Sequence, residues 1–400
     1  MRKTLRIVIF LILLLMLTTV MLLRYFNIGG TPAAPMTTVS TDSAPAASPS
    51  ATVPVTATPE PTPEPTPEPT PTPEPTPEIL TISAIGDCTL ITHNKLPGGE
   101  TSPYSYTSVM NGDYAYPFSR TVQYFADDEL TIANLECTFS DKQLYSDTLF
   151  HFRAPADFAQ ILTAGQVDFV NTANNHTADY GLEGMQDTWA ALDTIGMPYC
   201  KEGESRILTT ENGLKVGIYC DYNGYYPKTD KCVEAINQLR SDGADYVICM
   251  FHWGQEEGVY HPVQFQIDLA HACIDAGADL VYGSHSHTLQ PIEEYNGSYI
   301  LYSMGNWSFG GSTSPRDMDT AIVQIHVKRD LDGSISNDGY TIIPCCVSSK
   351  PVLEGYTAEA YNDYCPTPYA EGSEEYDRAM SKLTGDFGGP NLNVDYSNLQ

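Results

Sequence analysis

Residues 280–287 read Leu-Val-Tyr-Gly-Ser-His-Ser-His, a short apolar run that passes directly into two histidines. Four other stretches share this plan: Leu80–Ile85 runs into Gly86-Asp87, Leu130–Ala133 into Asn134-Leu135-Glu136, Val167–Thr172 into Asn174-Asn175-His176, and Tyr246–Phe251 into His252. Helical patterns separate these runs, and the alternation predicts an α/β fold with mainly parallel strands.

The polar groups at the ends of the five runs predict a shared binding site. In an open α/β sheet, ligands bind in the crevice beyond the carboxyl ends of the strands, so we expect these groups to converge there. Asp, Glu, Asn and His are ligands for Mn²⁺, Fe or Zn²⁺, and the chain has no thiolate set typical of a structural zinc. We therefore expect a divalent metal site of the catalytic type.

Two segments between the runs predict helices that cover the sheet. Gly181–Ile195 and Gln264–Ala276 both carry apolar residues at three- and four-residue intervals, which is typical of amphipathic helices. In the first segment the stripe consists of Leu182, Met185, Trp189, Leu192 and Ile195. We expect this stripe to be part of the core.

The composition describes an acidic, globular protein. The 400 residues include 20 Lys and Arg against 50 Asp and Glu, a formal net charge of −30. Such a charge opposes docking through a basic face, and we exclude nucleic acid as a partner. A hydrophobic fraction of 42% and 26 tyrosines do not fit a disordered chain, so the acidic excess belongs to the surface of a folded body.

The N-terminus predicts a membrane segment. Residues 1–6 carry three basic side chains and Ile7–Leu23 is apolar apart from two threonines, which indicates a signal anchor within residues 1–30. A single-pass helix here would place the bulk of the chain outside the cell. Cleavage near Ala33-Ala34 is the alternative, and it would make the protein secreted.

Residues 31–78 predict a disordered, proline-rich linker. Proline occupies every second position of Pro59–Glu78, with Thr or Glu between. Such a tract favours polyproline II and would hold a domain roughly 60 Å from its anchor; a ligand for a proline-binding module is the alternative. The main domain then spans residues 79–354. The acidic, tyrosine-rich extension, residues 355–400, either caps that domain or stays loose.

Six motifs between Thr81 and Gly310 resemble those of a known family. They are Gly86-Asp87, Asn134-Leu135-Glu136, Asn174-Asn175-His176-x-x-Asp179-x-Gly181, His252-Trp253-Gly254-x-Glu256, Gly283-x-His285-x-His287 and Tyr302-Ser303-Met304-Gly305-Asn306. In this order the chain resembles the CapA-type poly-gamma-glutamate capsule-biosynthesis family. That family is related to the calcineurin-like metallophosphoesterases, so the resemblance implies a layered α/β/β/α sandwich with a two-metal centre.

The resemblance implies roles for eight residues. Six are implied ligands of one or two metal ions, with Glu136 in the bridging position: Asp87, Glu136, Asn175, His252, His285 and His287. His176 is implied to contact the reacting group, and Asp179 to orient His176. Other readings stay open, because an Asp before a helix is often its N-cap and Gly305-Asn306 suits a tight turn.

Some positions depart from the phosphoesterase pattern. The usual Asp-x-His has Thr89 at its third position, and residues 87 and 89 of a strand share a face, so one strong ligand is missing. One of the two metals would then be weak or absent. Glu136 stands where Asp is usual. Cys88 and Cys137 flank the two carboxylates, but strand alternation should direct Cys88 away from the site, and the ten cysteines suit core positions.

These features predict an extracellular, membrane-anchored protein of poly-gamma-glutamate or related anionic surface-polymer production. Its chemistry would be metal-dependent hydrolysis, of a phosphoester or of the amide of a glutamyl polymer. Its expected partners are membrane proteins that synthesise or export the polymer. Two alternatives remain, a non-catalytic export or assembly factor that grips the polymer and a surface phosphodiesterase or nucleotidase.

Overall fold

The computed structural model describes residues 76–142, 149–224, 226–256, 258–355 and 361–389. The predicted anchor, residues 1–30, and nearly all of the predicted linker lie outside these ranges. Within them, no helix combines the length and the apolar character needed to cross a bilayer.

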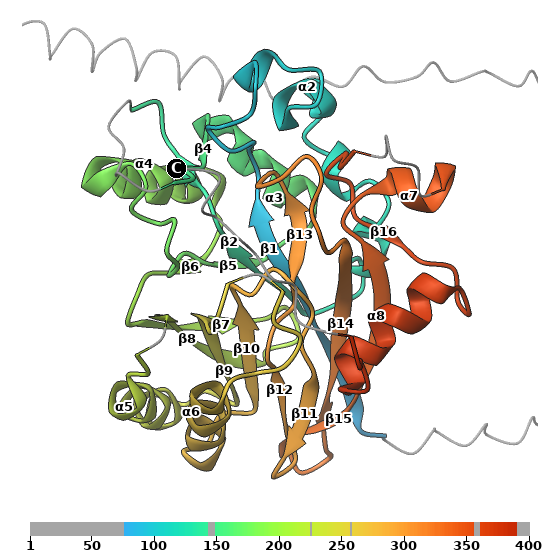
Figure 1. The fold of residues 1–400 in the computed structure, drawn as a ribbon. Coiled ribbons are helices and arrows are strands. Elements are labelled where there is room, and N and C mark those ends of the chain that lie inside the picture. Colours follow the sequence, from blue (N-terminus) through green and yellow to red (C-terminus); the bar gives the residue numbers. More distant parts are fainter. Residues whose placement is uncertain (1–75, 143–148, 225, 257, 356–360, 390–400) are drawn as a thin grey trace, which may run out of the picture. The chain divides into compact units, whose positions relative to one another are not determined.

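Two mixed sheets form the centre of the fold (Figure 1). The first has the order β16-β15-β14-β1-β2-β5-β6, with β13 also paired to β1. Its strands are β1 (Glu78–Thr89), β2 (Leu130–Leu135), β5 (Phe169–Asn171), β6 (Tyr199–Cys200), β13 (Asn306–Phe309), β14 (Asp319–Arg329), β15 (Ile335–Cys346) and β16 (Thr367–Pro368). A separate short ladder joins β3 (Thr138–Phe139) to β4 (Arg153–Ala154).

The second sheet has the order β11-β12-β10-β9-β8-β7. Its strands are β7 (Glu204–Thr209), β8 (Lys215–Gly224), β9 (Tyr246–Trp253), β10 (Leu280–Ser284), β11 (Ile292–Tyr295) and β12 (Ser298–Leu301). All five apolar runs predicted as strands are strands, three in the first sheet and two in the second. Their mutual pairings are parallel, as expected. The long antiparallel hairpin of β14 and β15 was not predicted.

The two sheets pack face to face through one buried cluster. Ile82 of β1 and Val323 of β14 share it with Ile218 of β8, Ile248 of β9 and Leu280 of β10, all fully buried. Because successive strand residues point to opposite faces, each sheet also has a second apolar face that needs a cover.

Helices cover the outer faces. On the first sheet, α3 (Gln160–Ala164) and α4 (Gly181–Ile195) pack into one cluster. On the second, α5 (Thr229–Ser241) and α6 (Gln264–Asp275) pack into another. Among the described residues, the other α-helices are α2 (Tyr106–Met110), α7 (Ser349–Glu354) and α8 (Glu374–Thr384). The layers therefore run helix, sheet, sheet, helix (Figure 1).

Helix α4 has the predicted bounds, and the predicted stripe is confirmed in part: Leu192 is fully buried, and Trp189 and Ile195 pack against the same cluster. Leu182 is 65% exposed, and the buried residues are Gly184, Thr188, Ala191 and Leu192. The physical reason is close approach, because a Cβ on Gly184 would lie 3.2 Å from Thr138 Cγ2 of β3 and 2.6 Å from Tyr180 Cβ. Small residues therefore make the closest contact of α4, and Leu182 is the member of the stripe that lies outside the core.

Part of the predicted C-terminal extension belongs to the folded body. Strand β16 pairs with β15, and α8 lies against β14 and β15 (Figure 1). Ala379 and Leu383 of α8 share a buried cluster with Leu289, which lies just beyond the predicted His285 and His287 pair. Residues 361–389 thus pack close to the segment that carries these histidines.

Candidate metal centre

The two sheets bring five predicted ligands together. Asp87 lies on β1 and Glu136 directly follows β2 in the first sheet, while His252 lies on β9 and His285 and His287 follow β10 in the second. The site is therefore formed by strands of two sheets, and not at the edge of a single sheet. Four of the five side chains are at most 2% exposed, and His287 is 14% exposed.

One group of side chains consists of Asp87, Glu136 and His287. One potential ligand atom of each lies within 4.8 Å of the others. His287 Nδ1 is 3.6 Å from Asp87 Oδ2, and His287 Nε2 is 3.8 Å from Glu136 Oε1. Two carboxylates and one imidazole thus converge without direct hydrogen bonds between these atom pairs, which are too far apart.

A second group consists of Glu136, His252 and His285, again with ligand atoms within 4.8 Å of one another. His252 Nε2 lies 3.5 Å from Glu136 Oε1 and 2.8 Å from Asn175 Oδ1. Glu136 belongs to both groups, so its carboxylate occupies the position between them.

Backbone geometry makes this convergence feasible. A Cβ on Gly86 would lie 2.2 Å from Gly305 O, and one on Gly283 would lie 2.1 Å from Tyr302 O. Glycine therefore lets both strands approach their neighbours closely. His285 and His287 have φ values of 103° and 55°. Non-glycine residues rarely adopt this left-handed region, and such strain is concentrated at functional sites.

Neighbouring polar groups orient the candidate ligands. Asn134 Nδ2 donates to Asp87 Oδ1 at 2.8 Å, and Thr89 Oγ1 donates to Glu136 Oε2 at 3.1 Å. Ser284 Oγ lies 2.8 Å from His252 Nδ1. Asn134 Nδ2, which can only donate, lies 3.2 Å from His252 Nδ1, so the proton of the neutral His252 ring is on Nε2 and is donated to Asn175 Oδ1. Thr89 thus acts as a hydrogen-bond donor at the position of the missing histidine.

Asn306 is a residue that we assigned to a turn and that reaches the site instead. It begins β13, directly opposite Asp87 of β1. Its Oδ1 lies 2.8 Å from His287 Nδ1 and is an acceptor for the proton there. A Gly-Asn pair looks like an ordinary turn in sequence; its membership of an ordered motif was the available signal.

His176 and Asp179 form a second, adjoining pair. His176 Nδ1 lies 2.9 Å from Asp179 Oδ2, and the buried Asp179 also accepts from Phe152 N at 3.0 Å. Tyr180, not Asp179, precedes α4 as its N-cap. The structure therefore places Asp179 on the His176 ring and not at a helix terminus.

The pKa shifts follow from burial and crowding of charge. Burial raises the pKa of Asp87 to about 6, with the nearby Glu136 carboxylate adding to the rise. Burial acts in the same direction on Glu136, but the imidazoles of His287 and His252 outweigh it and lower the pKa of that carboxyl. For His285, burial lowers the pKa well below its ordinary value, and His252 and His287 reinforce the effect.

His176 behaves differently from His285. Burial lowers its pKa, but the hydrogen bond to Asp179 and the charge of Glu136 outweigh burial, so the net shift is upward. A histidine with a raised pKa holds a proton that it can donate near neutral pH.

The donor set fits a divalent cation. Glu136 Oε1 and His285 Nδ1 are buried and have no hydrogen-bond partner among the described residues. Buried polar atoms are normally paired, so two unpaired ones on residues of the same ligand group need an explanation such as an ion. Carboxylate oxygens with imidazole nitrogens suit Zn²⁺, Mn²⁺ or Fe.

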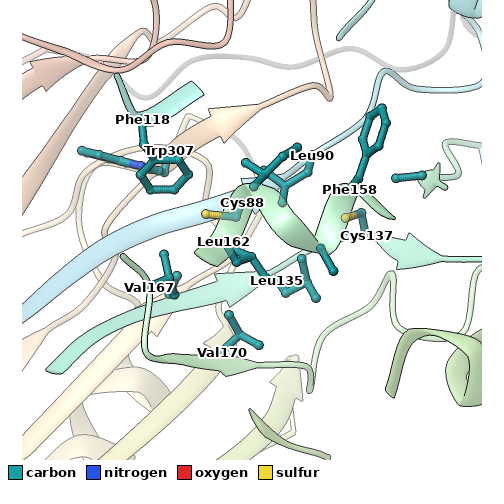
Figure 2. Packing of buried hydrophobic residues seen from close by; sticks show 14 of the residues in the cluster. Cys88, Leu90, Phe118, Leu135, Cys137, Phe158, Leu162, Val167, Val170 and Trp307 are labelled. Atoms are coloured by element: carbon teal, nitrogen blue, oxygen red, sulfur yellow. The ribbon is translucent and has the colours of Figure 1, made fainter. Parts of the chain in front are cut away.

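Cysteine does not contribute to either group. Figure 2 shows Cys88 and Cys137 among Leu90, Leu135 and Phe158, in the apolar cluster on the outer face of the first sheet. Burial raises the pKa of both thiols, which disfavours the thiolate that a metal would need. All ten cysteines are buried and unbridged.

Comparison with known proteins identifies the sequence family. Residues 81–310 match the family model described as bacterial capsule synthesis protein PGA_cap. The PGA biosynthesis protein CapA of Bacillus subtilis is 31% identical over 242 residues, which cover 55% of this chain and 62% of the relative. The capsule biosynthesis protein CapA of Bacillus anthracis is 27% identical over 278 residues, 63% of this chain and 64% of the relative. The matched part thus spans somewhat less than two thirds of these relatives.

Among solved structures, the calcineurin-like phosphoesterase YfkN of Bacillus subtilis is similar to this chain. It is 16% identical, with a TM-score of 0.40, and the alignment covers 67% of this chain and 90% of that one.

Proposed function

The chain belongs to the PGA_cap family of bacterial capsule synthesis proteins, and from this premise we propose that it is a metal-dependent hydrolase of anionic surface-polymer production. The proposed fold type is that of the metallophosphoesterases, and the proposed polymer is poly-gamma-glutamate or a related one. The observation that carries the proposal is the buried Glu136 carboxylate, which is shared by two ligand groups.

The proposed ligands are Asp87, Glu136 and His287 on one side, and Glu136, Asn175, His252 and His285 on the other. A bound divalent ion polarises a scissile group and lowers the pKa of a water molecule. Asn134 and Thr89 hold the two carboxylates in place through their hydrogen bonds.

His176 is the proposed proton donor to the leaving group. Its Nδ1 is held by Asp179, so the opposite nitrogen, Nε2, is the one left for the reacting group. The Phe152 ring packs edge-on against the imidazole at 4.5 Å between centroids, which limits its rotation. Asp179 is buried and keeps both contacts fixed.

The alternative is a protein that grips a polymer without cleaving it. Thr89 favours this alternative, because it donates to Glu136 where phosphoesterases use a histidine ligand. One ion would then be weakly held. A phosphodiesterase or nucleotidase without a capsule role is a further outcome that the test below distinguishes.

We propose that the folded body lies outside the cell, held by an anchor within residues 1–30 and a linker over residues 31–78. Membrane proteins of polymer synthesis or export are the proposed partners. With a net charge of −30, the chain would repel a polyanion unless bound cations dominate the local field. Chelation with EDTA should therefore weaken binding of poly-gamma-glutamate, and an unchanged Kd would contradict this route to binding.

The decisive experiment measures metal content and turnover of the full-length protein. With Mn²⁺, the protein is incubated with a phosphodiester, a phosphomonoester and poly-gamma-glutamate. Hydrolysis that is lost in His252→Ala but kept in His271→Ala, a substitution on α6 outside the site, supports an enzyme. Metal-dependent retention of the polymer without turnover supports the binder.

The substrate separates the remaining outcomes. Cleavage of the phosphoesters alone, with no effect on the polymer and no binding of it, indicates a phosphodiesterase or nucleotidase without a capsule role. A full-length protein that holds no divalent ion and turns over nothing contradicts the proposed hydrolase.

A further inference from the structure

Asn175 has a problem of orientation that the carboxylate ligands Asp87 and Glu136 do not share. Its amide ends in one oxygen and one NH₂ group, and only the oxygen can bind a cation. A rotation of about 180° about the last side-chain bond would present the NH₂ group instead. Something must hold the oxygen toward the site.

The contacts of the two amide atoms differ in kind. Asn175 Oδ1 lies 2.8 Å from His252 Nε2, on the side of Glu136. Asn175 Nδ2 donates to Glu256 Oε1 at 3.2 Å. An ionised carboxylate only accepts hydrogen bonds, so Glu256 favours the NH₂ group and repels the oxygen. In the rotated amide, the Asn175 oxygen would face the Glu256 carboxylate, and both groups are hydrogen-bond acceptors.

Glu256 is well placed for this task and poorly placed to bind the ion itself. Its side chain is 44% exposed, and its Oε1 lies 4.0 Å from His285 Nε2. Neither ligand group includes it. It lies at the rim of the site, on the Nδ2 side of the Asn175 amide.

The segment that carries Glu256 is held on both sides. Before it, Gly254 N donates to Gly224 O at 3.0 Å. After it, Val259 O accepts from Thr288 Oγ1 at 3.1 Å and from Gln290 Nε2 at 2.7 Å. Thr288 directly follows His287, so the chain after β9 and the chain after β10 are fastened together.

We propose that Glu256 is a positioning residue that fixes the Asn175 amide with its oxygen toward His252 and Glu136. The inference rests on the proposed metal site and names a residue that sets its affinity. Glu256 acts through Asn175 and touches no ion.

The test is a double-mutant cycle on Zn²⁺ affinity, measured by calorimetry on the full-length protein without substrate. Glu256→Ala should weaken binding by about 10- to 100-fold, the usual effect of losing an outer partner of a ligand. In an Asn175→Asp background both terminal atoms are oxygens, so orientation no longer matters. There, Glu256→Ala should leave affinity unchanged or improve it, because a like charge is removed. Glu183→Ala, an exposed carboxylate on α4, is the charge control.

Equal losses in both backgrounds would overturn the proposal, because a direct ligand or a general charge effect predicts additivity. No loss in the native background would also overturn it. A native protein that binds no Zn²⁺ contradicts the proposed function instead. In that case the side-chain amide signal of Asn175 decides by NMR: slow proton exchange that Glu256→Ala abolishes supports the orientation, and equal exchange in both proteins refutes it.

Discussion

At the scale of single residues, Asn306 shows how a side chain outside the ligand set controls a ligand. Its Oδ1 accepts from His287 Nδ1 and thereby leaves Nε2 for the ion. We predict that Asn306→Ala weakens Zn²⁺ binding by about 10- to 100-fold, while Asn306→Asp keeps most of the affinity. Calorimetry measures both, with Asn296→Gly in an exposed turn as the control. Equal affinity in all three variants would contradict the assignment.

The pKa of Asp128, a residue outside the metal site, predicts that the stability of the protein depends on pH. Burial raises its pKa from 3.8 to about 6, and Asp168 and Glu129 add to the rise. The folded protein keeps this proton where the unfolded chain has lost it, so the contribution to stability is complete below about pH 4 and is lost as the pH rises through 6.

Asp128→Asn should therefore stabilise the protein at pH 7. Because Asp128 is partly open to solvent, which screens its charge, we expect a gain of about 1 kcal/mol in the free energy of unfolding. Urea denaturation at pH 4 and pH 7 measures it, and the gain should vanish at pH 4. Asp127→Asn, at the exposed neighbouring position, is the control; a gain of the same size there would refute a specific role for Asp128.

At the scale of elements, Gly86 sets the distance between β1 and the chain that leads into β13. Asp87 N donates to Gly305 O at 2.9 Å, and a Cβ on Gly86 would lie 2.2 Å from the same oxygen. We predict that Gly86→Ala forces the two segments apart and lowers the free energy of unfolding by about 3 kcal/mol. Gly388→Ala, with no neighbouring atom within 4 Å of its Cβ, should be nearly neutral. Similar urea midpoints for the two variants would contradict this packing.

Elements also show what could and could not be predicted from the sequence. The strand residues before Asp87, Glu136 and His252 form short, mainly apolar runs, and such runs are typical of buried strands. The positions at which those strands end could therefore be predicted from the sequence, and with them most of the proposed ligands. The burial of α4 was predicted correctly at Leu192 and wrongly at Leu182, because the closest packing there uses Gly184. Asn306 was assigned to a turn although it belongs to one of the six motifs, because a Gly-Asn pair also suits a turn and the sequence does not show its hydrogen bond to His287.

At the scale of the whole molecule, a buried ionic network fastens the C-terminal helix to the sheet that carries Asp87. Lys382 of α8 is 2% exposed, and its Nζ lies 2.6 Å from Asp317 Oδ2 and 2.7 Å from Asp319 Oδ2. Arg378 and Tyr369 also bond Asp319. These partners are about sixty residues apart in sequence, so no local pattern could have revealed them.

The same lysine connects α8 to the segment that carries Glu256. Its Nζ lies 4.8 Å from the centre of the Tyr260 ring, which packs on Phe387. We predict that Lys382→Met leaves the buried Asp317 without its cation and Asp319 with Arg378 as its remaining cation, and that it destabilises the protein by about 3 kcal/mol. Lys350→Met, in an exposed ion pair on α7, should change stability by less than about 1 kcal/mol.

Hydrogen exchange distinguishes local release of α8 from general loosening. If Lys382 joins α8 to the site, Lys382→Met should accelerate exchange at residues 370–389 and 258–263 more than in β1 and β2. Uniform acceleration across all four regions would mean that the network only adds stability. A selective effect would mean that residues beyond the matched family region, 81–310, help to hold the rim of the metal site.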